Sequence, residues 1–202
     1  MTRFAVMAVA AMLLAPGQGV FAQTESARRP ADRPFVAPVN PAPGLTLTST
    51  GFADGGVIPD KYAHSGSPDV SPPLAWDFVP PGTVSFVLIV HDPDLALHKA
   101  SEDVLHWLAF NIPGEKRALP EGVPLGAILS DGTVQISNIA RTNGYVGVGA
   151  RAPGPYHHYM FELFALDTRL NMTASATRAQ VIDAMEGHIL AKGVEVGRFH
   201  RS

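Results

Sequence analysis

Histidines that could bind a ligand or transfer protons are concentrated in two parts of the sequence. Of the eight histidines, three surround an Asp-Pro-Asp turn and two are adjacent in a later segment: His91, His98 and His106, then His157 and His158. An imidazole changes charge near neutral pH, and its neutral form both donates and accepts hydrogen bonds. This clustering indicates a polar site suited to an anion, a proton transfer or a metal ion.

The later segment predicts that polar side chains share one face of a strand. Successive side chains of a strand point to opposite faces. The residues expected on one face are therefore His157, Tyr159, Phe161 and Leu163. By the same rule, we expect His106 on the face of Leu108 and Phe110, at the open end of its strand.

A carboxylate stands where it could orient one of these imidazoles. Asp92 follows the apolar run 84–90 almost directly, and Pro93 fixes the backbone beside it. A carboxylate that accepts a ring N–H fixes the tautomer and orientation of an imidazole. The alternative is that Asp92 and Asp94 only cap the turn through their own backbone. For Asp94 we prefer that alternative, and for Asp92 both stay open.

The loop that leads into His157 is rich in glycine and proline. Gly147 and Gly149 lack side chains, so backbone N–H groups near them could approach an anion closely. The loop lacks the Gly-Lys-Ser/Thr end of a Walker loop and the strand and helix context of a dinucleotide fingerprint. It therefore predicts no nucleotide cofactor, and without the nearby histidines it would be taken for a surface loop.

The elements that must position these residues are mostly short strands. From Leu45 onward, apolar runs alternate with Gly, Pro, Asp and Asn, a pattern typical of a β-sandwich or barrel. Strands are predicted around residues 45–47, 84–90, 106–112, 159–166 and 194–196. The run 84–90 is almost wholly apolar, which favours burial on both faces.

One helix is expected over residues 177–190, with an apolar stripe formed by Val181, Ile182, Met185 and Ile189. His188, near its end, is interpreted as structural.

The first 44 residues predict an export signal and a linker. Arg3 is followed by an apolar run over residues 4–14, and Val20 and Ala22 suit the positions that signal peptidase reads. The apolar run is shorter than the roughly 20 residues that span a bilayer. We therefore predict a signal peptide over residues 1–22, a Pro-rich disordered arm over 23–44 and a folded domain over 45–202. The mature chain is expected to be periplasmic or secreted, without a transmembrane segment.

Composition excludes several classes of function. The formal net charge of −3 leaves no basic excess for a nucleic-acid backbone, so no nucleic-acid partner is expected. The absence of cysteine excludes disulfides, thiolate nucleophiles and thiolate metal sites.

Three ordered motifs resemble the phosphatidylethanolamine-binding protein family, in its bacterial Raf-kinase-inhibitor-like branch. They are Asp-Pro-Asp at 92–94, His-Trp-Leu-Ala-Phe-Asn-Ile-Pro at 106–113, and the stretch from Gly-Tyr at 144–145 through His-His-Tyr at 157–159 to Asp167. The resemblance covers nearly all of residues 45–201. It implies a mostly β fold, a sandwich of two antiparallel sheets with a few short helices. It also implies a small pocket for phosphate, acetate or phosphorylethanolamine head groups.

The resemblance also implies which residues bind the ligand. By motif position they are Asp92, His106, His157 and Tyr159, together with backbone from Gly147 to Gly149. Val148 and Arg151 depart from the family pattern, in which prolines are commoner in this loop. Arg151 could add a cation beside a bound anion or point into solvent.

The expected function is non-catalytic binding of a small anion, with no cofactor and no metal. One alternative is inhibition of a protein partner such as a protease. Another is a hydrolase using Asp92, His106 and His157 as an acid-base set, although no nucleophile motif accompanies them. The same three residues meet the ligand count of a catalytic zinc site, but the resemblance argues against a metal.

Overall fold

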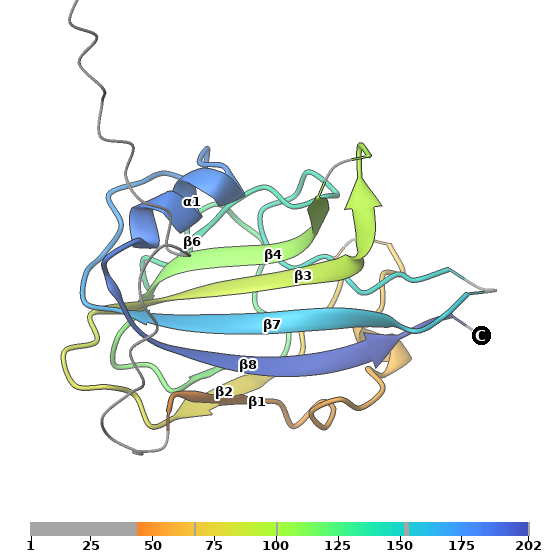
Figure 1. Ribbon diagram of the computed structural model, residues 1–202, viewed down its shortest axis with the longest axis horizontal. Helices are drawn as coiled ribbons and strands as arrows, with labels where there is room; N and C mark the ends of the chain where they lie inside the picture. Colours follow the sequence, from red (N-terminus) through yellow and green to blue (C-terminus); the bar gives the residue numbers. More distant parts are fainter. Residues whose placement is uncertain (1–43, 67, 100, 152–153, 202) are drawn as a thin grey trace, which may run out of the picture. The chain divides into compact units, whose positions relative to one another are not determined.

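The computed structural model describes residues 44–66, 68–99, 101–151 and 154–201 (Figure 1). The strands are β1 (Thr46–Thr48), β2 (Leu74–Asp77), β3 (Ser85–Leu97), β4 (Glu102–Pro113), β5 (Ala118–Leu119), β6 (Val134–Gln135), β7 (His157–Leu166) and β8 (Ile189–Phe199). The helical elements are the short turn η2 (Asp60–Tyr62) and the helix α1 (Arg178–Met185). The predicted signal peptide lies outside the described residues, as does the predicted arm except for Gly44.

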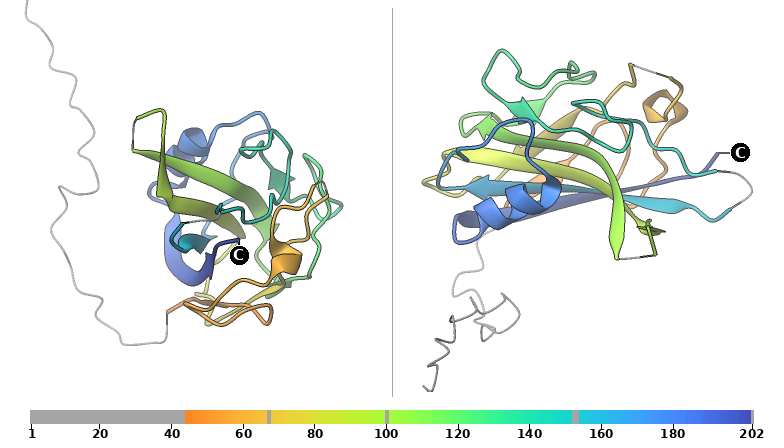
Figure 2. Two further views of the ribbon diagram at one scale, coloured as in Figure 1. Left: turned by 90° about the vertical axis from the view of Figure 1, so that its right-hand side faces the viewer. Right: turned by 90° about the horizontal axis from the view of Figure 1, so that it is seen from above.

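Two antiparallel sheets form the fold. The larger has the strand order β6-β4-β3-β7-β8, and the smaller has the order β1-β2-β5. The small sheet and α1 lie on opposite faces of the large sheet (Figures 1 and 2). The prediction of a mostly β fold with two antiparallel sheets is confirmed. No helix among the described residues is long and apolar enough to cross a bilayer.

The apolar run that becomes β3 is buried on both faces, as its sequence predicts. Phe86, Leu88 and Val90 pack in the core between the two sheets. Val87 and Ile89 point the other way and pack in a second core that includes residues of α1. Full burial of one such side chain contributes about 1.5–3 kcal/mol, so this strand anchors both layers.

The helix is shorter than the sequence predicts. Thr177 caps α1 by accepting the Gln180 N–H, and the Gln180 side chain accepts the Thr177 N–H in return. The helix ends at Met185, because Gly187 adopts a φ of 84°, outside the helical region. Val181 and Met185 are buried as expected, whereas Ile182 is exposed and Ile189 begins β8. The prediction of a helix through residue 190 was therefore wrong, and the predicted strand 194–196 is part of the longer β8.

Candidate functional site

A cavity of about 710 Å³ lies at one end of the sandwich. The six predicted site residues, Asp92, His106, Gly147, Gly149, His157 and Tyr159, all line it. The left view of Figure 2 looks onto this end. The β3–β4 hairpin, the segment after η2 and the loop before β7 surround the start of β7 there. The structure therefore brings together residues from distant parts of the sequence, and their ligand-binding role stays a prediction.

Asp92 orients His157 across neighbouring strands. His157 Nδ1 lies 2.7 Å from Asp92 Oδ2, and the Asp92 side chain is only 2% exposed. Asp92 Oδ1 accepts the Asp94 N–H at 2.9 Å. Asp92 therefore orients the imidazole with one oxygen and caps the turn with the other, so the alternative that it only caps the turn was wrong.

Asp94 does more than cap that turn, so the preferred interpretation of this residue was wrong. Its carboxylate accepts the backbone N–H of His158 at 2.5 Å and lies 2.9 Å from His158 Nδ1. Burial opposes ionisation of Asp94, but these contacts outweigh it and keep its pKa below the usual value. The pair joins β3 to β7 beside the cavity.

A β-bulge places His106 in the cavity. Val90 pairs with Trp107 but His91 pairs with Leu105, so His106 is an extra residue in β4. His106 therefore shares the inner face with Trp107, whereas Leu108 and Phe110 point toward α1. The prediction from simple alternation, that His106 shares a face with Leu108 and Phe110, was therefore wrong. The bulge also lies within β4 and not at its end.

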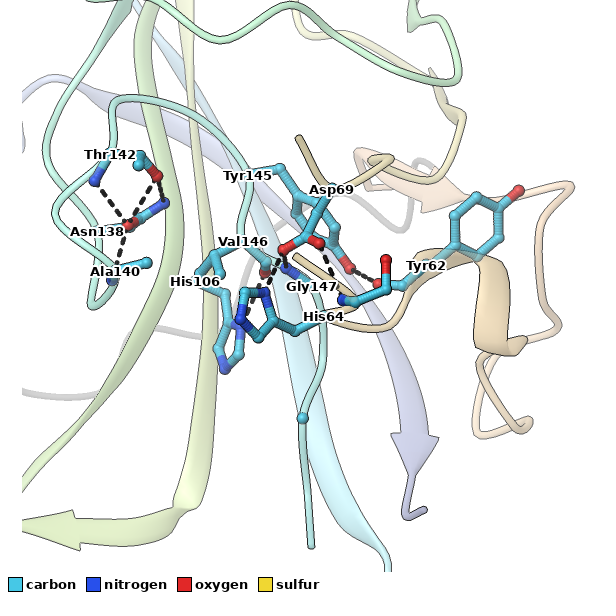
Figure 3. Close-up of polar contacts among 12 residues, drawn as sticks. Tyr62, His64, Asp69, His106, Asn138, Ala140, Thr142, Tyr145, Val146 and Gly147 are labelled. Atoms are coloured by element: carbon cyan, nitrogen blue, oxygen red, sulfur yellow. Dashed lines mark hydrogen bonds and ion pairs between the residues drawn. The ribbon is translucent and has the colours of Figure 1, made fainter. Parts of the chain in front are cut away.

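His106 is held in one tautomer by a backbone carbonyl. Its Nδ1 donates to the Val146 oxygen at 3.0 Å, as Figure 3 shows, and its ring meets Tyr159 edge to face. Burial lowers the pKa of His106, so the ring is neutral near pH 7. Its Nε2 atom then carries a lone pair and accepts a hydrogen bond.

Tyr159 organises the glycine-rich loop. Its hydroxyl accepts the Gly149 and Ala150 N–H groups, each at 3.1 Å. Burial, with a smaller contribution from the Asp92 carboxylate, raises the pKa of Tyr159 to about 12. The hydroxyl is protonated at physiological pH, and its two hydrogen bonds fix the loop to β7.

The loop N–H groups predicted to meet an anion already donate within the protein. Gly147 donates to Asp69 at 2.8 Å, and Val148 donates to the Tyr62 carbonyl at 3.3 Å. The Gly149 and Ala150 N–H groups donate to the Tyr159 hydroxyl. The imidazole Nε2 atoms of His106 and His157, by contrast, have no hydrogen-bond partner among the described residues.

Sequence reasoning missed two residues beside the cavity. His64 lines it and Asp69 binds His64, yet neither lies near the histidine clusters in the sequence. Their spacing follows no helix or strand period, so the sequence carried no signal for them. Arg151 also lines the cavity and is exposed.

The other clustered histidines lie elsewhere. His91 points to the opposite face of the sheet, where its Nδ1 is 2.6 Å from Asp103 and its Nε2 is 3.4 Å from Glu162. The contact with His91, together with Lys192, lowers the pKa of Glu162 to about 2. His98 is exposed and pairs with its neighbour in the hairpin, Glu102.

The zinc alternative finds no assembled ligand set in the part of the chain that the structure describes. No three His, Cys, Asp or Glu side chains there are grouped closely enough to hold a metal ion. Asp92 uses one oxygen on His157 and the other on the backbone.

Comparison with known proteins agrees with this geometry. Residues 48–200 match the family model described as phosphatidylethanolamine-binding protein. A UPF0098 protein of Methanothermobacter thermautotrophicus is 40% identical over 157 residues, which cover 78% of this chain and 99% of the relative.

Solved structures are similar as well. A putative phosphatidylethanolamine-binding protein homologue from Chlamydia trachomatis, CT736, is 33% identical with a TM-score of 0.66 and covers 79% of this chain and 99% of its own. Escherichia coli YbcL, described as a member of the mammalian PEBP family, is 26% identical with a TM-score of 0.68 and covers 79% of this chain and 100% of its own. The chain belongs to the phosphatidylethanolamine-binding protein family.

Proposed function

We propose that the cavity binds small phosphate-like anions, including phosphorylated head groups, and does not transform them. The observation that carries the proposal is the locked pair His106 and His157. Each ring has its Nδ1 held by the protein, by Val146 or by Asp92, which leaves Nε2 for a ligand. Tyr159 and Asp92 fix this arrangement from the interior, and both are 1% exposed.

Binding of an anion to these rings is linked to protons. A neutral ring with Nδ1–H presents a lone pair at Nε2, which accepts from a protonated phosphate oxygen but repels an unprotonated one. Protonation at Nε2 turns the same atom into a charge-assisted donor, the stronger kind of hydrogen bond. Affinity for phosphate is therefore expected to increase as the pH falls from 8 to 6.

Substitution of His157 tests the site directly. Glutamine at this position, His157→Gln, keeps a donor for Asp92 but cannot be protonated near neutral pH. We expect phosphate affinity at pH 6.5 to fall about tenfold or more by calorimetry. The control is His188→Gln, because His188 also pairs with an aspartate, at 2.8 Å from Asp167, but does not line the cavity.

The same samples separate binding from the alternatives. If the wild type hydrolysed a phosphomonoester or a carboxylic ester and His157→Gln did not, the protein would be a hydrolase and not only a binding protein. Inhibition of a protease that survives this substitution would indicate the protein-partner alternative. Unchanged phosphate affinity in His157→Gln would contradict the proposed site.

We also propose that the protein acts after export, on the basis of the sequence features of residues 1–22. Expression of the full chain in a Gram-negative host, followed by fractionation and N-terminal sequencing, tests this. A periplasmic product that begins at Gln23 is expected. A cytoplasmic product that retains the apolar segment would refute it.

A further inference from the structure

A second His–Asp pair at the cavity has the same geometry as His157 and Asp92. His64 Nδ1 lies 2.7 Å from Asp69 Oδ2, and the Asp69 side chain is 3% exposed. The distance between His157 and Asp92 is also 2.7 Å, and Asp92 is equally buried. His64 itself is about half exposed, so it stands at the mouth of the cavity and not in its interior.

Asp69 is fixed and ionised. Its Oδ2 also accepts the Gly147 N–H, and its Oδ1 accepts the Ser65 N–H at 3.2 Å. Burial opposes ionisation, but the hydrogen bonds from Gly147 and His64 outweigh it and hold the pKa of Asp69 below its usual value. Figure 3 shows this carboxylate between His64 and Gly147.

The backbone of His64 is anchored to the loop that carries the site. The His64 N–H donates to the Val148 carbonyl at 2.8 Å, and the Arg201 guanidinium donates to the His64 carbonyl. A Cβ at Gly147 would lie only 2.3 Å from the His64 nitrogen, so the two segments are in direct contact. The position of His64 is therefore set by the same loop that Tyr159 organises.

Three imidazoles thus reach the cavity from three separate elements: His64 after η2, His106 on β4 and His157 on β7. Each has its Nδ1 bound to a fixed oxygen, and each Nε2 is without a hydrogen-bond partner among the described residues. All three rings line the same cavity. A terminal phosphate has three unesterified oxygens, whereas a phosphodiester has two.

We propose that His64 is a third ligand-binding imidazole that selects terminal phosphate groups over phosphodiesters, and that Asp69 is its positioning residue. The proposal rests on the anion-binding function argued above. His106 and His157 hold two oxygens of the head group, and His64 contacts the third at the mouth. In a diester that third position carries a second substituent, which cannot accept the same hydrogen bond.

Two ligands that share one amine and differ only in esterification provide the test. Phosphorylethanolamine is a monoester, and glycerophosphoethanolamine is the matching diester. Calorimetry on the full chain at pH 6.5 is expected to show the monoester binding about tenfold more tightly. Part of any preference comes from the higher charge of the monoester, so the decisive quantity is how a substitution changes the ratio of the two affinities.

His64→Gln is expected to lower that ratio severalfold by weakening the monoester alone. Asp69→Asn keeps one acceptor oxygen and replaces the other with an NH2 group that cannot accept a hydrogen bond, and it is expected to lower the same ratio. The matched control is His188→Gln, in which an equally exposed imidazole paired with an aspartate is removed away from the cavity, with no change expected. His157→Gln is expected to weaken both ligands.

The outcomes separate this proposal from the function on which it rests. Equal weakening of both ligands by His64→Gln, or no effect on either, overturns the selective role of His64 and leaves the anion site intact. Failure of the wild type to bind either ligand overturns the anion site, and the role of His64 with it.

Discussion

At the scale of single residues, the chemistry of the site depends on what each polar side chain already contacts. His106 and His157 carry the same ring, but a carbonyl holds one and a carboxylate holds the other. Burial raises the pKa of Tyr159 further above the physiological range, and its hydroxyl oxygen accepts two loop N–H groups. The residues that look most reactive in the sequence thus divide into imidazoles that line the cavity and side chains that hold them in place.

A buried acid outside the site gives a prediction about stability. Burial, followed by the nearby Asp54 carboxylate, raises the pKa of Glu195 to about 7 from 4.5. Between these pH values the unfolded chain has lost the proton and the folded one retains it. The stability that the protonated Glu195 provides is therefore full below pH 4.5 and is lost as the pH rises through 7.

Glu195→Gln removes this dependence. At pH 8 the variant is expected to melt several degrees above the wild type, because a difference of about 1 kcal/mol moves Tm by roughly 2–4 °C in a domain of this size. At pH 4.5 the two proteins are expected to have nearly the same Tm. An increase in Tm of the same size at both pH values would show that the charge of Glu195 is not the cause.

At the scale of elements, the site depends on two departures from regular strands. The bulge in β4 turns His106 inward, and the bridge between Ala63 and Val148 brings His64 to the loop. Asn138 adds a third constraint, because its side-chain oxygen accepts the Ala140 and Thr142 N–H groups and so shapes the neighbouring wall (Figure 3).

The contact between the loop and the His64 segment predicts a severe effect of a small substitution. In Gly147→Ala, the added methyl would lie 2.3 Å from the His64 nitrogen and 2.4 Å from the Ala63 carbonyl carbon. Neither backbone atom can move far, so we expect a loss of about 1–3 kcal/mol in urea unfolding. Gly44→Ala, where nothing lies within 4 Å of the new methyl, is the control. Equal stability of the two variants would contradict the close packing.

These elements also explain which parts of the site the sequence could predict. His157 and Tyr159 share a face because β7 is regular, so alternation alone was sufficient. The face of His106 was wrong because the bulge depends on pairing with β3, which is a non-local property. The pairing of His64 with Asp69 depends on contact with a loop far along the chain. The end of α1 was missed because the periodic pattern continued past Gly187.

At the scale of the whole molecule, the two faces of the large sheet have different roles. One face packs against α1 and buries a small core, while the other packs against the small sheet and ends in the cavity. The net charge of −3 gives the protein no general attraction for anions. Under the proposed function, the attraction for an anion must therefore come from groups in the cavity itself, and proton uptake by its imidazoles would make the affinity depend on pH.

Nitrogen NMR of the imidazole rings during a phosphate titration at pH 7 tests this claim most directly. We predict that the Nε2 signals of His106 and His157 move toward the protonated position as phosphate saturates the protein, and that His157→Gln weakens the response of His106. Signals of both rings that stay unchanged up to saturating phosphate would contradict the account.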